Sequence, residues 1–293
     1  MNILLLGKTG QVGFELDRTL SPLGTLNAPG RETLDLFNEK AVANYLASTK
    51  PYLIVNAAAW TAVDAAEDHQ ADAERLNAGL PKQLAGYAAA NSARLVHYSS
   101  DYVYPGDGDG DRAWLETSNT GPLSIYGSTK LQGDQAIEQS GADYLIFRTS
   151  WVYSARGNNF MKTMLRLAKS KAELNIVADQ VGAPTPARLI AQVSAFAIHD
   201  KLGKGLYHLA PRGETNWHGF AQQIFRLAQE NGEQLTMGPE NAYPIPTSDY
   251  YTPATRPLNS RMDITKLEGA LKIELPDWQS QLALTLGEFI EES

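Results

Sequence analysis

Short apolar runs alternate with helical spacing through the first half of the chain. The run at residues 2–6 has the length of a buried strand, and Gly7 ends it. Apolar residues then recur at Val12, Leu16 and Leu20, which is the spacing of one helix face. Further buried strands are predicted at residues 25–28, 52–55, 94–98 and 144–147.

The same alternation predicts the fold class. An alanine-rich stretch at residues 68–91 has helical character and is expected to begin a new helix at Pro81. Apolar strands separated by helices indicate a parallel sheet covered on both faces. We therefore expect an α/β fold with a doubly wound, Rossmann-type parallel sheet, built mainly from residues 1–150. Residues 151–293 are expected to combine a smaller substrate-binding subdomain with the last elements of that sheet.

Composition narrows the class of protein further. The 293 residues include 25 Lys and Arg against 33 Asp and Glu, and this formal charge of −8 argues against general affinity for nucleic acid or anionic membranes. The chain has no cysteine, which excludes disulfides, thiol catalysis and cysteine-ligated metals. No apolar run approaches the roughly 20 residues of a membrane-spanning helix, and no basic leader precedes the first run, so we expect a cytoplasmic protein.

A glycine-rich turn directly follows the first predicted strand. The sequence GKTGQVG has the spacing G-x-x-G-x-x-G. Glycine lets backbone N–H groups approach a pyrophosphate, and the start of the following helix adds a favourable dipole. This position favours a dinucleotide site over an ordinary strand–helix turn. The candidate cofactor contacts are Gly7, Thr9, Gly10, Gln11, Val12 and Gly13.

The residues after the second predicted strand bear on the choice of cofactor. Arg31 stands where an acidic residue would bind the ribose 2′-hydroxyl of NAD, and a cation there suits the 2′-phosphate of NADP. Glu32 adjoins Arg31 and weakens this distinction, so we expect NADPH with NADH as the alternative. Asp35 and Leu36 follow at the place where the adenine ring is expected.

A second group of residues carries acid–base chemistry. Tyr126 and Lys130 share one face of a predicted helix, so the ammonium is expected to stabilise the phenolate and lower the pKa of Tyr126. Ser100 ends a predicted strand and is placed to hydrogen-bond a carbonyl oxygen that Tyr126 protonates. Together with the glycine turn, these three candidate catalytic residues predict a carbonyl reductase.

Seven segments together resemble the dTDP-4-dehydrorhamnose reductases, a family within the extended short-chain dehydrogenase/reductase superfamily. They are GKTGQVG, VNAAAWTAVDAAE, HYSSDYVYPG, YGSTKLQGDQ, IFRTSWVY, GNNF and DQVGAPT, in register from residue 1 to about residue 266. The resemblance implies reduction of the 4-keto group of dTDP-6-deoxy-L-lyxo-4-hexulose (dTDP-4-dehydro-L-rhamnose) by NADPH or NADH. The product, dTDP-L-rhamnose, supplies surface polysaccharide such as the O-antigen of lipopolysaccharide. Ser100 replaces the threonine that is frequent in the family but keeps the hydroxyl.

The resemblance also implies further contacts at the site. On the cofactor side these are Ala57, Ala58, Ala59, Trp60 and Thr61, together with Tyr126 and Lys130. On the substrate side they are Ser100, Asp101, Tyr102, Tyr126, Trp151, Asn159, Arg256 and Asn259. An indole offers a sugar ring an apolar face, and a guanidinium binds diphosphate oxygens in pairs. From the residues alone, Trp151 could equally be a core aromatic and Arg256 a member of a structural ion pair.

Two acidic features do not predict a metal site. Alternating aspartates at residues 105–111 resemble the start of a calcium loop, but Arg112 and Ser118 occupy the positions that need glycine and glutamate. We expect an acidic turn there. Some relatives use Mg²⁺ at a dimer contact formed by C-terminal acids, and Glu288, Glu291 and Glu292 could offer such ligands here, although a charged helix end is the preferred interpretation. The sequence leaves monomer and homodimer open.

Two other functions share these motifs. Nucleotide-sugar epimerases and dehydratases have the same fold and catalytic residues, but they keep NAD(H) bound through an internal redox cycle. Regulatory subunits of methionine adenosyltransferase keep the cofactor fold without this catalysis. The intact set of Ser100, Tyr126 and Lys130 favours the reductase over both.

Overall fold

A parallel sheet of six strands forms the centre of the protein. The computed structural model describes residues 1–107 and 112–291, so the end of the predicted acidic turn and Glu292 lie outside the described residues. The strand order is β10-β5-β4-β3-β1-β2, and every neighbouring pair is parallel. The strands are β1 Asn2–Leu6, β2 Thr25–Asn27, β3 Leu53–Asn56, β4 Arg94–Ser100, β5 Asp143–Thr149 and β10 Gly205–His208. The predicted doubly wound α/β fold is confirmed.

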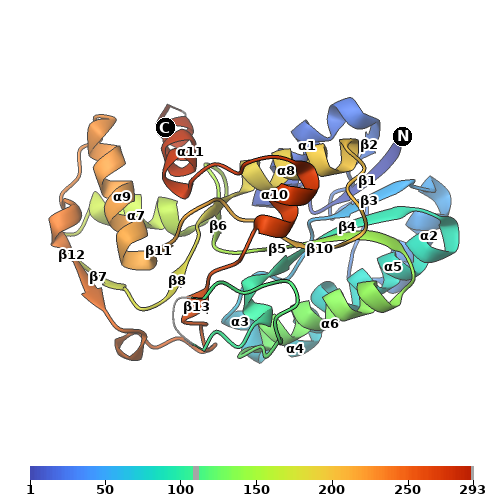
Figure 1. Ribbon diagram of the computed structural model, residues 1–293, viewed down its shortest axis with the longest axis horizontal. Coiled ribbons are helices and arrows are strands. Elements are labelled where there is room, and N and C mark those ends of the chain that lie inside the picture. The colour runs from blue at the N-terminus through green and yellow to red at the C-terminus, as the bar shows by residue number, and fades with distance from the viewer. Residues whose placement is uncertain (108–111, 292–293) are drawn as a thin grey trace.

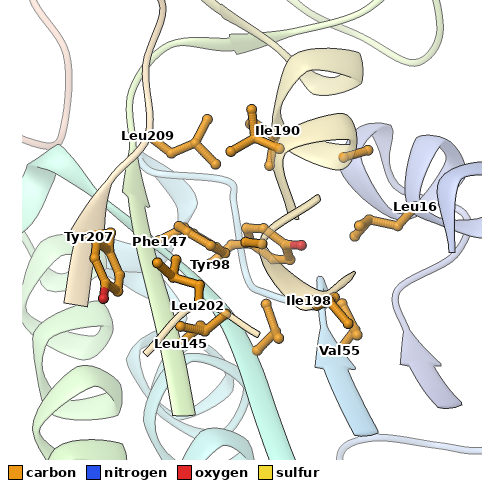
Figure 2. Packing of buried hydrophobic residues seen from close by; sticks show 14 of the residues in the cluster. Leu16, Val55, Tyr98, Leu145, Phe147, Ile190, Ile198, Leu202, Tyr207 and Leu209 are labelled. Atoms are coloured by element: carbon orange, nitrogen blue, oxygen red, sulfur yellow. The ribbon is translucent and has the colours of Figure 1, made fainter. Parts of the chain in front are cut away.

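Helices cover both faces of this sheet because successive strand residues point to opposite sides. Ile3 and Leu5 of β1 pack in one buried cluster, whereas Leu4 and Leu6 pack in another. The first cluster includes residues of α1 Gln11–Thr19, α8 Ala187–His199 and α10 Thr265–Leu271. The second includes residues of α2 Glu39–Thr49, α5 Leu80–Asn91 and α6 Ile125–Gln139. Figure 1 shows the two helix layers on either side of the sheet, and Figure 2 shows the first cluster from close by.

A third buried cluster forms a separate lobe beside the sheet (Figure 1). Its helices are α7 Phe160–Ala168, α9 Trp217–Glu230 and α11 Trp278–Glu291. The parallel strands β7 Leu174–Val177 and β12 Ala242–Ile245 lie next to them. Shorter pairs link this lobe to the sheet: β8 Val181–Gly182 with β11 Thr215–Asn216 and β13 Asn259–Ser260, and β6 Val152–Tyr153 with β9 Thr185–Pro186.

The helical stretch at 68–91 is interrupted close to Pro81, as predicted. It consists of α3 Ala65–Asp68, α4 Gln70–Glu74, a π-helical turn Arg75–Gly79 and α5, which begins at Leu80 with Pro81 in its first turn. Pro81 has no N–H to bond the carbonyl four residues earlier, that of Asn77. That carbonyl faces Gly133 of α6 instead, where an added Cβ would lie 2.1 Å from the Asn77 oxygen. The interruption is therefore a widened turn, and α6 packs closely against it.

Short 3₁₀ turns connect the longer elements, at Ser21–Leu23, Asp101–Val103, Pro239–Asn241 and Thr247–Asp249. Among the described residues, every helix is too short or too polar to span a lipid bilayer. The strand order changes direction between β1 and β3, because the chain leaves β1 for β2 on one side and later returns to β3 on the other. In open α/β sheets, ligands bind beyond the carboxyl ends of the strands at such a point.

Candidate active site

The glycine turn after β1 lies at this switch point. Gly7 has φ +86°, and a Cβ there would lie 2.7 Å from the backbone of Ala57 and Ala58, which follow β3. A Cβ at Gly13 would lie 2.0 Å from the Gly7 carbonyl oxygen. Glycine is therefore required at both positions, and the first turn of α1 sits close to the sheet. Among residues 1–107 and 112–291, no side chain caps the start of α1, so its first N–H groups can face an anion.

The loop after β3, residues 57–61, is held in place by Asn77. The Asn77 amide oxygen accepts from the Trp60 N–H at 2.9 Å, and its nitrogen donates to the Trp60 carbonyl at 3.1 Å. The same nitrogen donates to the Thr129 hydroxyl of α6 at 3.2 Å. Asn77 is fully buried and was absent from the predicted site. Nothing in the local sequence distinguishes Asn77 from the other polar residues of the alanine-rich stretch 68–91.

The candidate catalytic residues come from the end of β4 and the start of α6. Ser124 caps α6 by accepting the Gly127 N–H at 3.2 Å, which places Tyr126 in the first turn. The Ser100 hydroxyl donates to Asp101 Oδ1 at 3.0 Å and accepts the Tyr102 N–H at 3.2 Å.

The prediction that Lys130 lowers the pKa of Tyr126 is wrong. Burial raises the pKa of Tyr126 above its ordinary value, and hydrogen bonding to Ser100 offsets only part of this rise. Lys130 Nζ instead donates to the Tyr98 carbonyl at 2.6 Å and lies 3.3 Å from His97 Nε2. Burial lowers the pKa of Lys130 to about 8, against the opposing charge of Asp134. The four-residue spacing fixed a shared helix face, but not the direction of the lysine side chain.

Tyr102 and Arg256 lie beside Tyr126. The rings of Tyr102 and Tyr126 meet edge to face at 5.4 Å between centroids. Arg256 pairs with Asp64 at 2.6 Å and donates to the Tyr102 hydroxyl at 3.3 Å. The alternative of a structural ion pair therefore describes Arg256, although its guanidinium is one side chain away from Tyr126. Burial raises the pKa of Asp101 to about 6, despite hydrogen bonds from Ser260 and Ser100.

Trp151 stacks on a second tryptophan. It follows β5 in a left-handed conformation with φ +49°, and its ring lies 3.8 Å from that of Trp217, measured between centroids. The Trp217 indole donates to the Gln180 amide oxygen at 3.0 Å. Trp151 and Trp217 are both half-buried, so neither is an ordinary core aromatic. Trp217, from α9, was missed because nothing in its local sequence links it to Trp151.

Two predicted substrate contacts hold neighbouring segments together. Asn159 accepts the Lys162 N–H at 3.1 Å, which caps α7, and donates to Gln11 of the glycine turn at 2.8 Å. Asn259 donates to the Arg112 carbonyl at 2.9 Å and accepts the Arg261 N–H at 3.1 Å. Asn159 thus lies beside the glycine turn, and Asn259 tethers the chain at Arg112.

The residues expected around the adenine and ribose follow β2. Arg31 is exposed and forms no ion pair with residues 1–107 or 112–291. The Glu32 carboxylate folds back over Gly30, where a Cβ would lie 2.2 Å from it. Asp35 accepts the Phe37 N–H at 3.0 Å, and Leu36 packs against the second buried cluster. Arg31 is therefore available to an anionic ligand.

No group of three or more His, Asp or Glu side chains within the described parts of the chain is placed to hold a metal ion. Glu288, one of the acids considered for Mg²⁺, pairs with Arg188 of α8 at 2.7 Å. That contact ties α11 to α8.

The glycine turn after β1 and the pair Ser100 and Tyr126 lie at the same, carboxyl edge of the sheet. The fold and the site define an NAD(P)-dependent oxidoreductase of the Rossmann type. The family described as "RmlD substrate binding domain" matches residues 1–290, and the chain belongs to this family.

Named relatives agree with this assignment. The chain is 48% identical over 296 residues to the dTDP-4-dehydrorhamnose reductase of Escherichia coli K12, covering 98% of each chain. It resembles the solved structure of a dTDP-4-dehydrorhamnose reductase from Clostridium acetobutylicum, with a TM-score of 0.91, 33% identity, and coverage of 99% and 100%. A Bacillus anthracis dTDP-4-dehydrorhamnose reductase solved in complex with NADP has a TM-score of 0.87, 32% identity and 99% coverage of both chains.

Proposed function

We propose that this protein reduces the 4-keto group of dTDP-4-dehydro-L-rhamnose to dTDP-L-rhamnose with NADPH, the last step of dTDP-rhamnose synthesis. NADH is the alternative reductant. One observation carries the proposal: Ser100 and Tyr126 lie at the carboxyl edge of the sheet that also carries the glycine turn. The reductases named among the relatives at 48% and 33% identity supply the substrate class.

The chain's own residues fit the cofactor. The crowding at Gly7 and Gly13 brings the uncapped start of α1 against the sheet, where its N–H groups can bind a pyrophosphate. The loop 57–61 adjoins this turn and is proposed to contact the ribose and nicotinamide. The exposed guanidinium of Arg31 supports NADPH over NADH, because a 2′-phosphate offers it two charges. When bound, NADPH supplies the hydride.

Ser100 and Tyr126 are proposed to act on the substrate carbonyl in two different roles. Ser100 turns its hydroxyl from Asp101 to the substrate carbonyl oxygen and polarises the carbonyl. Tyr126 donates its phenolic proton to that oxygen as the hydride reaches the carbon, which gives the alcohol. The raised pKa of Tyr126 keeps the phenol protonated at neutral pH, as a proton donor requires. Solvent then restores the proton to Tyr126.

The substrate is proposed to lie between the sheet edge and the third-cluster lobe. Trp151, stacked on Trp217, is proposed to offer one indole face to the sugar ring. Tyr102, which carries Arg256 on its hydroxyl, is proposed to contact the substrate beside Tyr126. Because Asp64 already neutralises part of the Arg256 charge, a diphosphate would have to share that guanidinium with Asp64. Asp101, Asn159 and Asn259 remain predicted substrate contacts.

We further propose the division of labour that the sequence predicted. Residues 1–150 hold the cofactor and the catalytic residues, and residues 151–293 supply the substrate-binding subdomain. The position of β10 within the large sheet supports the interleaving of that second part. We propose a cytoplasmic location, where nucleotide sugars and NADPH are made.

The test is NADPH oxidation with enzymatically generated dTDP-4-dehydro-L-rhamnose. Tyr126→Phe should lower kcat at least about 100-fold and leave the Kd for NADPH within about twofold. Tyr52→Phe is the matched control, since Tyr52 is exposed at the opposite, amino edge of the sheet and should behave as wild type. Full activity of Tyr126→Phe would refute the proposed proton donor. Turnover without net NADPH consumption would indicate an epimerase or dehydratase, and NADPH binding without turnover would indicate a regulatory subunit.

A further inference from the structure

The loop at residues 154–159 connects β6 to α7 and contacts the start of α1. Asn159, the last residue of this loop, donates from Nδ2 to the Gln11 side-chain oxygen at 2.8 Å. The Arg156 guanidinium lies 4.1 Å from the centre of the Phe14 ring in α1. The third-cluster lobe therefore touches the helix that follows the glycine turn, at the first residue of that helix.

Two backbone contacts fix which way the Asn159 amide is turned. Its oxygen accepts the Lys162 N–H at 3.1 Å, as the cap of α7. Its nitrogen donates to the Ser154 carbonyl at 2.7 Å. A flipped amide would place its oxygen against that carbonyl and its NH₂ group against the Lys162 N–H. The nitrogen of Asn159 is therefore the atom that faces Gln11.

The contact with Asn159 in turn fixes the Gln11 amide. Because Asn159 presents an N–H group, Gln11 accepts it with the amide oxygen, and the Gln11 NH₂ group points away from Asn159. That NH₂ group has no hydrogen-bond partner among residues 1–107 and 112–291. Gly157 lies against the same side chain, where a Cβ would be 3.3 Å from Gln11 Cγ. The loop thus limits both the position and the orientation of the Gln11 amide.

The unpartnered NH₂ group belongs to the open start of α1. Gln11 is the first residue of that helix, and helical side chains tilt toward the helix N-terminus, where the first backbone N–H groups also point. We propose that Asn159 is a positioning residue for cofactor binding: it orients the Gln11 amide so that the NH₂ group joins these backbone N–H groups in binding the NADPH pyrophosphate. This inference rests on the cofactor of the proposed function and adds a residue of the lobe to the cofactor site.

A change that preserves the helix cap separates the two roles of Asn159. Asn159→Ser keeps an oxygen that can accept the Lys162 N–H, but serine is too short to reach Gln11. The Kd for NADPH should rise about three- to tenfold, because the Gln11 amide can then turn its oxygen toward the phosphates. Asn216→Ser is the matched cap exchange in α9, where Asn216 accepts the Gly219 N–H at 2.7 Å, and it should leave that Kd unchanged. Full NADPH affinity in folded Asn159→Ser would overturn the proposal.

A double-mutant cycle measures whether Asn159 acts through Gln11. Gln11→Ala should raise the Kd for NADPH about tenfold, and adding Asn159→Ser should raise it less than about twofold further. An equal loss from Asn159→Ser with and without Gln11 would mean a purely structural role and would contradict the proposal. Adenosine 2′-phosphate lacks the pyrophosphate, so both single variants should bind it as the wild type does. A loss of its affinity that matches the loss for NADPH would count against the proposal as well.

Gln11→Glu leaves the cap of α7 untouched and decides the question if Asn159→Ser does not fold. One carboxylate oxygen can still accept the Asn159 N–H, whereas the other would face the pyrophosphate, so the Kd for NADPH should rise more than in Gln11→Ala. Gln11→Glu with the NADPH affinity of the wild type would refute the role of Gln11 and hence that of Asn159. A wild-type protein that binds no NADPH would refute the proposed cofactor instead.

Discussion

Replacement of Asn77 by alanine tests whether this buried amide joins the two halves of the proposed site. The change removes three hydrogen bonds: from the Trp60 N–H at 2.9 Å, to the Trp60 carbonyl at 3.1 Å, and to the Thr129 hydroxyl at 3.2 Å. Alanine cannot replace any of them. The loop 57–61 would then lose its link to α6.

The magnitude follows from the groups left without partners. Thr129 keeps its bond to the Tyr126 carbonyl at 3.0 Å, so the loss falls mainly on the two backbone groups of Trp60. A buried polar group without a partner costs about 1–3 kcal/mol, and these two are only partly buried. With the small cavity that the amide leaves, we expect the free energy of unfolding to fall by about 2–4 kcal/mol. Loosening of the loop by about 1.4 kcal/mol would raise the Kd for NADPH tenfold.

Urea unfolding and an NADPH fluorescence titration measure the two effects. Asn91→Ala is the matched control, because Asn91 lies at the end of α5, where its exposed amide bonds only the Tyr87 carbonyl at 2.9 Å. That control should stay within about 0.5 kcal/mol of wild type. Asn77→Ala with the same stability and the same NADPH affinity as the control would refute the reasoning.

Three more predictions follow from particular contacts. Arg31→Ala should weaken NADPH binding about 10- to 100-fold and leave NADH binding unchanged, because only NADPH carries the 2′-phosphate; equal losses in paired titrations would contradict this. Burial lowers the pKa of His208 to about 3, so between that pH and about 6.5 the unfolded chain binds more protons than the folded one. Because of His208, the free energy of unfolding should be about 2 kcal/mol lower at about pH 5 than at neutral pH. Urea unfolding that shows no such decrease would contradict this prediction. Gly133→Ala should lower the free energy of unfolding by about 1–3 kcal/mol, because the added Cβ would lie 2.1 Å from the Asn77 carbonyl oxygen. Gly86→Ala, on the open side of α5, should stabilise the protein slightly. Thermal unfolding that ranks the two variants the other way would count against the packing argument.

The fold class and the motifs that carry chemistry could be predicted from the sequence alone. Strand and helix periods are local properties, so the parallel sheet, the glycine turn at Gly7 and the helix carrying Tyr126 followed from residues a few positions apart. The carboxyl edge as the proposed site followed from topology, because all strands of a parallel sheet end at one edge. The helix start predicted at Pro81 was also a local property, because proline is favoured in the first turn of a helix, and α5 begins at Leu80.

The folded structure was needed to show which side chains meet and how burial shifts their pKa values. Asn77 hydrogen-bonds Thr129, which is 52 positions away in the sequence, and Arg256 hydrogen-bonds Asp64, which is 192 positions away. No rule of residue spacing relates positions so far apart. The pKa of Tyr126 moved opposite to its prediction because burial depends on everything packed around the phenol, whereas the sequence showed only a lysine one turn away. The contacts of Lys130 with His97 and the Tyr98 carbonyl also depend on the fold, because a buried amine bonds to the polar groups that the neighbouring strand places within reach.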